Sequence, residues 1–252
     1  MKRRFSYEYK MCNLNILVRK DLKHDADCIV PFLQGVTGHS FASNHDGEGF
    51  YADGKLVRSL FKINYFKWKK ILEGSRMIIT HQRLATSGYT GEYTQPFMNE
   101  DFVFVHNGIM ADFIKGSHSD SWVFFKKFQA RFKKLRMRNR EKKIILALKG
   151  LIEEQKGYCS FSIAILDRVT NMLYYLKNSK TKISFFRDSN LLFITTDNSN
   201  KNLLELFEES EFREYKVQSG KIFRIDAGLG IREIGSVRER SGVYESGSFH
   251  WF

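Results

Sequence analysis

The sequence predicts one α+β domain in which antiparallel sheets pack against helices. Short strand-like segments follow one another through tight connections in the second half of the chain, and they do not alternate regularly with helices. The 252 residues are 42% hydrophobic and 15% aromatic, with only 2 prolines and no Pro-rich or Gly/Ser-rich linker. This composition supports a single large core and argues against disorder.

In the first half of the chain, three strands are predicted where apolar residues run together or alternate with polar ones. They cover residues 13–18, 77–81 and 101–106. Residues 67–73 are predicted to form a short helix. Residues 35–54 contain SNHDGEGFYADG and are predicted to be a turn-rich connection, because Gly, Asn and Asp favour turns.

A long helix is predicted from Asp120, because phenylalanines recur at helical spacing as far as Phe132 and residues 144–152 continue the pattern. This helix is expected to bend or break near Asn139. Further strands are predicted at residues 160–167, 172–177, 183–187, 191–195 and 221–226, and a further helix at residues 201–207.

The sequence predicts a cytoplasmic protein. No apolar run approaches the roughly 20 residues that span a bilayer, so no membrane association is expected. Residues 1–10 lack the apolar segment of a signal peptide. Cys12, Cys28 and Cys159 are odd in number and have no metal-type spacing, so neither a metal nor another cofactor is expected.

The net charge of +13 belongs mainly to the body of the chain. Residues 1–11 carry four Lys or Arg and one Glu, so the remaining residues carry about +10. Much of this charge lies in residues 131–143 (RFKKLRMRNREKK), which start at Arg131 and end at Lys143. Such a run is typical of the solvated face of a helix, and it also fits a surface for nucleic acid or another anionic partner.

Four places in the sequence could together bind an amino acid and attack its side-chain amide. If Cys12 were the first residue, its α-amine, with a reference pKa of about 7.7–8.0, could accept the proton of its own thiol. Arg83, just past a predicted strand, could bind a carboxylate. Asn107-Gly108 offers an amide group and a backbone N–H for an oxyanion, and Asp120 could bind an ammonium.

Each of these residues also has a structural interpretation. Cys12 could be a buried cysteine at a strand edge, and Arg83 a surface ion-pair partner. Asn107-Gly108 could be a hairpin turn, and Asp120 a helix N-cap. His81 and His106 are interpreted as structural residues at strand ends, and Cys28 and Cys159 as core residues.

Five short motifs decide between these interpretations. They are HDGEG at residues 45–49, HQRLAT at 81–86, QPF at 95–97, HNGIM at 106–110 and SDSW at 119–122. In this order and spacing they resemble the class II glutamine amidotransferases, whose glutaminase domain is an N-terminal-nucleophile hydrolase. The resemblance covers roughly residues 12–197. It implies a four-layer αββα sandwich of two antiparallel sheets.

The resemblance also implies a role for each site residue. Cys12 would be the nucleophile, Asn107 and the Gly108 N–H the oxyanion hole, Arg83 with Thr86 nearby the binding site for the glutamine α-carboxylate, and Asp120 that for its α-amine. The reaction implied is hydrolysis of the glutamine side-chain amide through a cysteinyl thioester. The chain departs from the family pattern at Asn13, at Asn44-His45 and at Trp122, which stand for Gly, Arg-Gly and Glu.

The implied chemistry requires Cys12 to be the first residue. Residues 1–11 are therefore expected to be a leader that is removed, or to precede a true start at Met11. Residues 12–252 are expected to form one glutamine amidotransferase type-2 domain. Too few residues follow Asp197 for a synthetase domain, so ammonia is expected to reach an acceptor reaction on a separate partner protein.

Two alternatives to this function remain open. The protein could be catalytically silent, keeping residues 1–11 and binding glutamine or a partner without hydrolysing it. It could also be an enzyme with the same nucleophile and a different amide substrate, although Arg83 and Asp120 favour an α-amino acid.

Overall fold

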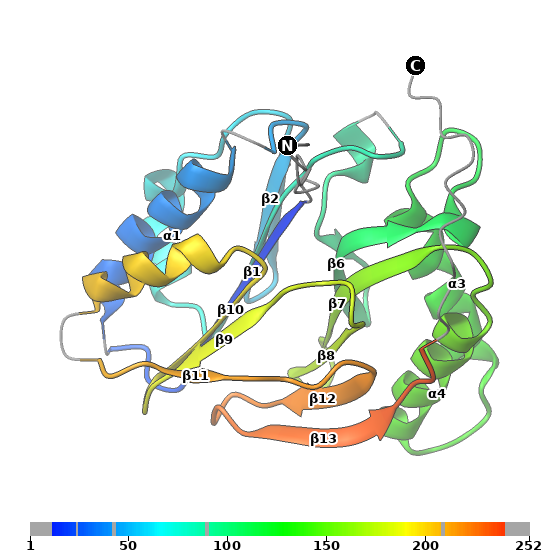
Figure 1. Ribbon diagram of the computed structural model, residues 1–252. Coiled ribbons are helices and arrows are strands. Elements are labelled where there is room, and N and C mark those ends of the chain that lie inside the picture. The colour runs from blue at the N-terminus through cyan, green and yellow to red at the C-terminus, as the bar shows by residue number, and fades with distance from the viewer. Residues whose placement is uncertain (1–11, 24, 42–43, 89–90, 208–209, 240–252) are drawn as a thin grey trace, which may run out of the picture.

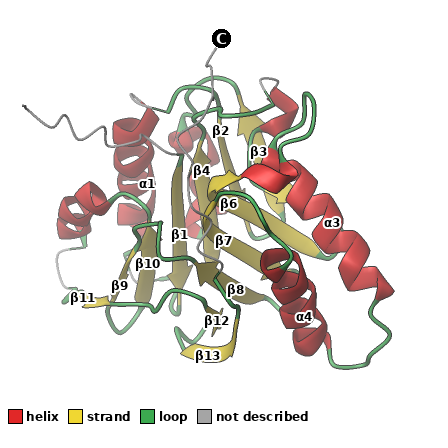
Figure 2. Ribbon diagram, turned by 45° about the vertical axis from the view of Figure 1, so that its right-hand side comes forward, coloured by secondary structure: helices red, strands yellow, loops and turns green. Residues whose placement is uncertain are grey.

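Two antiparallel sheets lie face to face at the centre of the protein, with helices on both outer faces. This arrangement is seen in the computed structural model, which describes residues 12–23, 25–41, 44–88, 91–207 and 210–239 (Figure 1). In Figure 2, α1 lies on one side of the strands, and α3 and α4 lie on the other. The predicted four-layer αββα sandwich is confirmed.

The first sheet has seven strands in the order β11-β9-β10-β1-β4-β2-β3, all antiparallel. Its central strand is the first strand of the chain, β1, which is entirely buried. The strands are β1 (Asn13–Arg19), β2 (Glu48–Ala52), β3 (Lys55–Ser59), β4 (Met77–Gln82), β9 (Ser184–Arg187), β10 (Leu191–Thr195) and β11 (Arg213–Tyr215).

The second sheet has six strands in the order β13-β12-β8-β7-β6-β5. Its longest ladder joins β6 to β7 over nine residue pairs. The strands are β5 (Phe97–Met98), β6 (Phe102–Met110), β7 (Cys159–Asp167), β8 (Met172–Lys177), β12 (Lys221–Ile225) and β13 (Ile231–Ser236).

The helices form the two outer layers. The α-helices are α1 (Ala26–Phe41), α2 (Lys69–Glu73), α3 (Asp120–Lys134) and α4 (Arg140–Glu153), and the 3₁₀ helices are η1 (Tyr65–Trp68), η2 (Gly91–Tyr93), η3 (Ala111–Phe113) and η4 (Asn198–Leu206). Helices α1 and η4 cover the first sheet, and α3 and α4 cover the second.

Three apolar layers hold the sandwich together. The middle layer lies between the sheets and includes Ile16 of β1 and Val105 of β6. One outer layer joins α1 to the first sheet through contacts such as Phe32 with Phe193, whose ring centroids are 4.9 Å apart. The other joins α3 to the second sheet, where Phe104 stacks on Phe125 at 5.2 Å. Alternate residues of one strand therefore serve two different layers.

Most predicted elements are present, and the predicted break near Asn139 is confirmed. Asn139 is the N-cap of α4, where its side chain accepts a hydrogen bond from the Lys142 N–H at 2.8 Å. The helix predicted at residues 201–207 is the 3₁₀ helix η4 instead.

The prediction of a turn-rich connection at residues 35–54 is wrong over much of its length. This segment contains the last turns of α1 and the whole of β2. Its glycines do not break α1, because Gly35 packs against Leu203 of η4 and the apolar face of the helix continues through Val36. Tertiary packing outweighs the turn preference of these residues.

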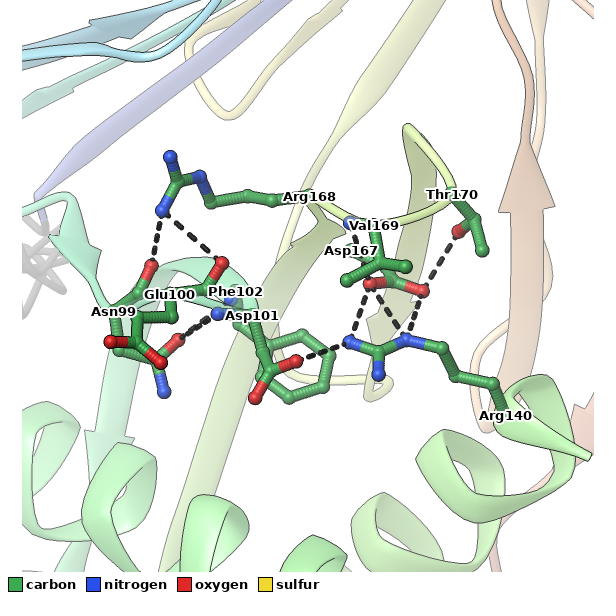
Figure 3. A network of polar contacts seen from close by, with 9 residues as sticks. All are labelled: Asn99, Glu100, Asp101, Phe102, Arg140, Asp167, Arg168, Val169 and Thr170. Carbon is green, nitrogen blue, oxygen red and sulfur yellow. Dashed lines mark hydrogen bonds and ion pairs between the residues drawn. The ribbon is translucent and has the colours of Figure 1, made fainter. Parts of the chain in front are cut away.

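The basic run at residues 131–143 spans the end of α3 and the start of α4, and part of its charge is used inside the protein. Arg140 donates to both oxygens of the buried Asp167 and to Asp101 (Figure 3). Its guanidinium also lies over the rings of Phe102 and Phe132. These contacts tie the start of α4 to the ends of β6 and β7.

Candidate active site

The predicted site residues gather at one end of the two sheets. Cys12 immediately precedes β1, and Arg83 immediately follows β4. Asn13 pairs with Gln82 across these neighbouring strands, so Cys12 and Arg83 lie side by side. Asp120 is the first residue of α3, as predicted.

One small cavity contains five of the six predicted site residues. Cys12, Arg83, Thr86, Gly108 and Asp120 all line it. The remaining lining residues are Leu84, Ser87, Tyr93, Gln95, His106, Ser119 and Ser121. Its volume of about 20 Å³ is enough for about one water molecule. An amino acid is much larger than this volume.

The Cys12 thiol is half-buried and held by backbone groups. Its Sγ lies 3.3 Å from both the N–H and the carbonyl oxygen of Leu84. Burial raises the pKa of this thiol from 9.0 to about 11, although the Leu84 backbone and the charge of Arg83 act in the opposite direction. The thiol is therefore protonated near neutral pH, and a nucleophilic attack by Sγ requires a base.

The Arg83 guanidinium is buried, which contradicts the interpretation of this residue as a surface ion-pair partner. Its Nη2 donates to the carbonyl oxygens of Ser87, at 2.7 Å, and Gly88. Asp46 and Gly47 hold the backbone of the same loop, because Arg83 N–H donates to the Gly47 carbonyl and Asp46 accepts from the Ala85 N–H. The HDGEG motif thus supports the HQRLAT motif.

Glu48 of the same motif is a buried carboxylate below the site. It accepts hydrogen bonds from the Ile63 N–H at 2.6 Å, from the Tyr65 hydroxyl at 3.0 Å and from the Gln82 amide at 3.3 Å. Burial raises its pKa above the ordinary value. Through Gln82 this carboxylate steadies the end of β4 that leads into Arg83.

Asn107 and Gly108 lie inside β6, so the prediction that they form a strand end, and the alternative of a hairpin turn, are both wrong. They pair with Ser162 and Phe161 of β7. Gly108 has φ +137°, and a Cβ there would lie 2.0 Å from the carbonyl oxygen of Ser160. Only glycine fits this backbone. Asn107 is buried and is not among the lining residues of the cavity, and its Oδ1 has no hydrogen-bond partner in the described part of the chain.

Asp120 is held in place by backbone donors. The Met110 N–H donates to Oδ2 and the Ser121 N–H to Oδ1, each at 2.8 Å. The N-cap of α3 is Ser119, whose Oγ accepts from the Trp122 N–H at 3.2 Å, so the interpretation of Asp120 as the cap is wrong. A carboxylate has further acceptor capacity, and Asp120 can still bind an ammonium group.

The two buried histidines are weak bases. Burial, followed by the charge of Arg83, lowers the pKa of His81 from 6.5 to about 3. Burial also lowers the pKa of His106. Their imidazoles are neutral near pH 7 and have little affinity for a further proton. His81 lies near the end of β4, but His106 lies in the middle of β6 and not at a strand end as predicted.

Seven residues that line the cavity were not among the predicted site residues, and three of them make contacts that matter for the site. Gln95 and Ser121 line the cavity, and each lies in one of the motifs, which is the signal that could have identified them. Tyr93 lines it as well, and its hydroxyl lies 2.5 Å from Nδ1 of His118. Trp122, which departs from the family pattern, stacks on His118 with ring centroids 4.9 Å apart. An aromatic group therefore occupies the position of the family's Glu.

In the described ranges, no group of three or more His, Cys, Asp and Glu side chains could hold a metal ion. None of the helices described is long and apolar enough to cross a bilayer.

Comparison with known proteins shows a likeness of fold. No protein-family model matches the chain, and no curated protein matches it. Among solved structures, it is similar to the glutamine phosphoribosylpyrophosphate amidotransferase of B. subtilis, with a TM-score of 0.60 and 15% identity over 88% of this chain and 49% of that one. The structure of the allosteric regulatory enzyme of purine biosynthesis gives a TM-score of 0.61 and 15% identity, over 88% and 48%.

This chain spans about half the length of both solved structures. At 15% identity the likeness is one of fold, and it confirms the fold that the motifs implied. The resemblance to glutamine amidotransferases thus agrees with the three-dimensional structure, while the sequence identity is too low to transfer an activity.

Proposed function

We propose that this protein is a glutaminase of the class II amidotransferase type, which hydrolyses the side-chain amide of glutamine through a cysteinyl thioester. The observation that carries the proposal is the cavity that Cys12, Arg83, Thr86, Gly108 and Asp120 share. These residues come from segments far apart in the sequence, and the fold brings a thiol, a cation, an anion and a backbone donor together. That set matches the groups of glutamine.

In the proposed reaction, the Cys12 sulfur attacks the amide carbon of glutamine. The thiol proton passes to the α-amine of Cys12 and then to the leaving nitrogen, so that ammonia departs as the C–N bond breaks. The Gly108 N–H stabilises the oxyanion, and the Asn107 amide, which does not line the cavity, has to turn toward it to do the same. Water then attacks the γ-glutamyl thioester, releasing glutamate and restoring the thiol.

The base in this scheme exists only if Cys12 carries a free α-amine. We therefore propose that residues 1–11, which lie outside the described residues, are removed or not translated, and that residues 12–252 form one amidotransferase domain. The raised pKa of the thiol supports the need for a base, and the lowered pKa values of His81 and His106 leave the α-amine as the better candidate.

The decisive experiment compares protein that starts at Cys12 with protein that keeps residues 1–11. Glutamate and ammonia release from glutamine is expected only from the shorter form, and Cys12→Ala should abolish it. N-terminal analysis of protein from its native host identifies the form that occurs there. Activity that needs residues 1–11 would overturn the α-amine as the base, and no activity in either form would favour the silent alternative.

The substrate assignment depends on Arg83. Arg83→Lys keeps the positive charge but removes the guanidinium, which can donate two parallel hydrogen bonds to a carboxylate. The KM for glutamine should rise about 10- to 100-fold, as expected for the loss of a charged hydrogen bond of about 1.5–3 kcal/mol. Hydrolysis of an amide without an α-carboxylate should change little. An unchanged KM for glutamine would point to the alternative of a different amide substrate.

Ammonia from this reaction would serve an acceptor reaction on a separate partner protein, and an anionic partner is a further part of the proposal. In the basic run, Arg131 and Arg140 have carboxylate partners, but Lys133, Lys134 and Arg136 are exposed. Binding of a 20-residue RNA or DNA probe, weakening as salt rises, is expected if nucleic acid is that partner. If the probe does not bind even at low salt, nucleic acid is excluded as that partner.

A further inference from the structure

Gln95 lies at the junction of three segments that carry the candidate site. It follows the HQRLAT loop, it faces β6 one residue before Asn107, and it contacts the start of α3. Its side chain is buried, and it lines the cavity. The proposed reaction gives Gln95 no role, either as the nucleophile or in binding the substrate, so its position needs another explanation.

The Gln95 side chain makes the hydrogen bonds to His106 that the backbone of a neighbouring strand would otherwise make. Phe97 of β5 pairs with Phe104 of β6, and continuing this register by two residues places Gln95 opposite His106. There the side-chain amide of Gln95, and not its backbone, forms hydrogen bonds with both the backbone N–H and the backbone carbonyl of His106. Oε1 accepts from the His106 N–H at 2.7 Å, and Nε2 donates to the His106 carbonyl at 3.1 Å.

These two bonds determine the orientation of the amide. A backbone N–H can only donate, so the atom 2.7 Å away from it must be the oxygen of Gln95. Nε2 then faces the His106 carbonyl with one hydrogen and has a second hydrogen left. Ser121 Oγ, at 3.3 Å, and His81 Nε2, at 3.4 Å, are its possible acceptors.

The same amide is connected to Asp120. Ser121 Oγ lies 2.8 Å from His106 Nδ1 and 3.3 Å from Asp120 Oδ1. Gln95 thus joins the strand that carries Asn107 and Gly108 to the carboxylate at the start of α3. The backbone of Gln95 also packs closely against Gly49. A Cβ on Gly49 would lie only 2.2 Å from the Gln95 carbonyl oxygen.

We propose that Gln95 is a positioning residue, whose side-chain amide holds β6 at His106 and thereby sets the place of the Gly108 N–H and the Asn107 amide. The proposal rests on the proposed function for its effect on catalysis, but the anchoring itself can be measured without turnover. Gln95 touches the backbone directly before the oxyanion groups and reaches Asp120 only through Ser121. Its loss should therefore affect the transition state more than glutamine binding.

The test uses Gln95→Met in protein that starts at Cys12. Met keeps the length of the side chain and removes both bonds, so kcat should fall on the order of 10- to 100-fold while KM changes less than about threefold. Gln155→Met is the matched control, because Gln155 is also buried and donates to a backbone carbonyl, that of Leu151, but does not line the cavity. This control should keep the wild-type kcat.

A second variant separates positioning from a loss of folded protein. In Gln95→Glu the carboxylate still accepts from the His106 N–H, but it donates to the His106 carbonyl only when protonated. Its kcat relative to wild type should therefore recover as the pH falls, whereas that of Gln95→Met should not. Equal pH profiles of the two variants would overturn the proposal.

Hydrogen exchange on the same proteins tests the anchoring without activity. The His106 and Gly108 amides should exchange faster in Gln95→Met than in wild type, while amides at the β7–β8 ladder stay as protected as before. Unchanged exchange at His106 would refute the anchoring even if kcat fell. A wild type that shows this protection but no glutamine hydrolysis would refute the proposed function and leave the anchoring intact.

Discussion

At the residue scale, Gly108 shows how one backbone position constrains the candidate site. The strand β6 continues through Gly108 with a φ of +137°, and the carbonyl of Ser160 on β7 fills the space where a side chain would begin. Gly108 can line the cavity in this conformation because it has no Cβ. The requirement for glycine here is structural first, and the proposed oxyanion role depends on it.

The first prediction concerns Gly108→Ala. The added Cβ would meet a backbone atom that cannot move cheaply, so this variant should lose glutaminase activity and several kcal/mol of stability. Gly116→Ala is the control, because Gly116 has φ +56° with open space around it. It should cost about 1–2 kcal/mol and keep activity. Urea unfolding measures the stability of the two variants, and glutamate release measures their activity. Equal losses of stability and activity in the two variants would contradict the structural requirement for glycine at position 108.

At the element scale, α4 is attached to the second sheet by Arg140 in its first turn. Asp167 at the end of β7 is fully buried, and Arg140 supplies three hydrogen bonds to it through Nε and Nη2, at 2.8 to 3.0 Å. Thr170 adds a third donor to the same carboxylate (Figure 3). The interaction ties the first turn of α4 to the end of β7, and it pairs the Arg140 charge within the protein although the side chain stays partly exposed.

The second prediction follows from this burial. Arg140→Ala would leave Asp167 without its cation, and the free energy of unfolding should fall by about 3 kcal/mol. Arg138→Ala, in the same basic run but exposed, should change it by less than about 0.5 kcal/mol. Urea denaturation of both variants is the measurement. A similar small loss for both would mean that the buried ion pair does not hold α4.

At the scale of the whole molecule, the site lies where the two sheets and the layer of α3 meet at one end. His81 belongs to the first sheet, His106 to the second, and Gln95 and Ser121 bridge them. The interior at this end is polar but contains neutral imidazoles. The stability of the protein should therefore depend on pH, because these histidines can take up a proton in the unfolded chain but not in the fold.

The third prediction gives the sign of that dependence. The pKa of His81 is about 3 in the fold and 6.5 in the unfolded reference, so its contribution to stability is present above 6.5 and is lost as the pH falls toward 3. The free energy of unfolding should fall by about 1.4 kcal/mol per pH unit for each such histidine. His81→Gln should show a shallower loss than wild type in urea unfolding at several pH values below 6.5. Parallel pH curves would show that His81 is not held neutral.

Much of the fold and site could be predicted from local patterns. Strand alternation, the helical spacing of phenylalanines and the capping residue Asn139 depend on near neighbours in the chain, so they were visible in the sequence. Segment 35–54 was predicted wrongly for the opposite reason. Its conformation depends on packing against η4 and on pairing with β4, which are distant in the chain.

The sequence by itself determined which residues could form a site: the motifs single out Arg83, Gly108 and Asp120 through their type and order, and Cys12 is the cysteine that precedes them. Only the tertiary structure decided that they line one cavity, that Asn107 does not line it, and that Gln95 links β6 to the start of α3. The physical reason is that residue type and spacing carry chemistry and local conformation. Distances between residues tens of positions apart follow from how the sheets and helices pack.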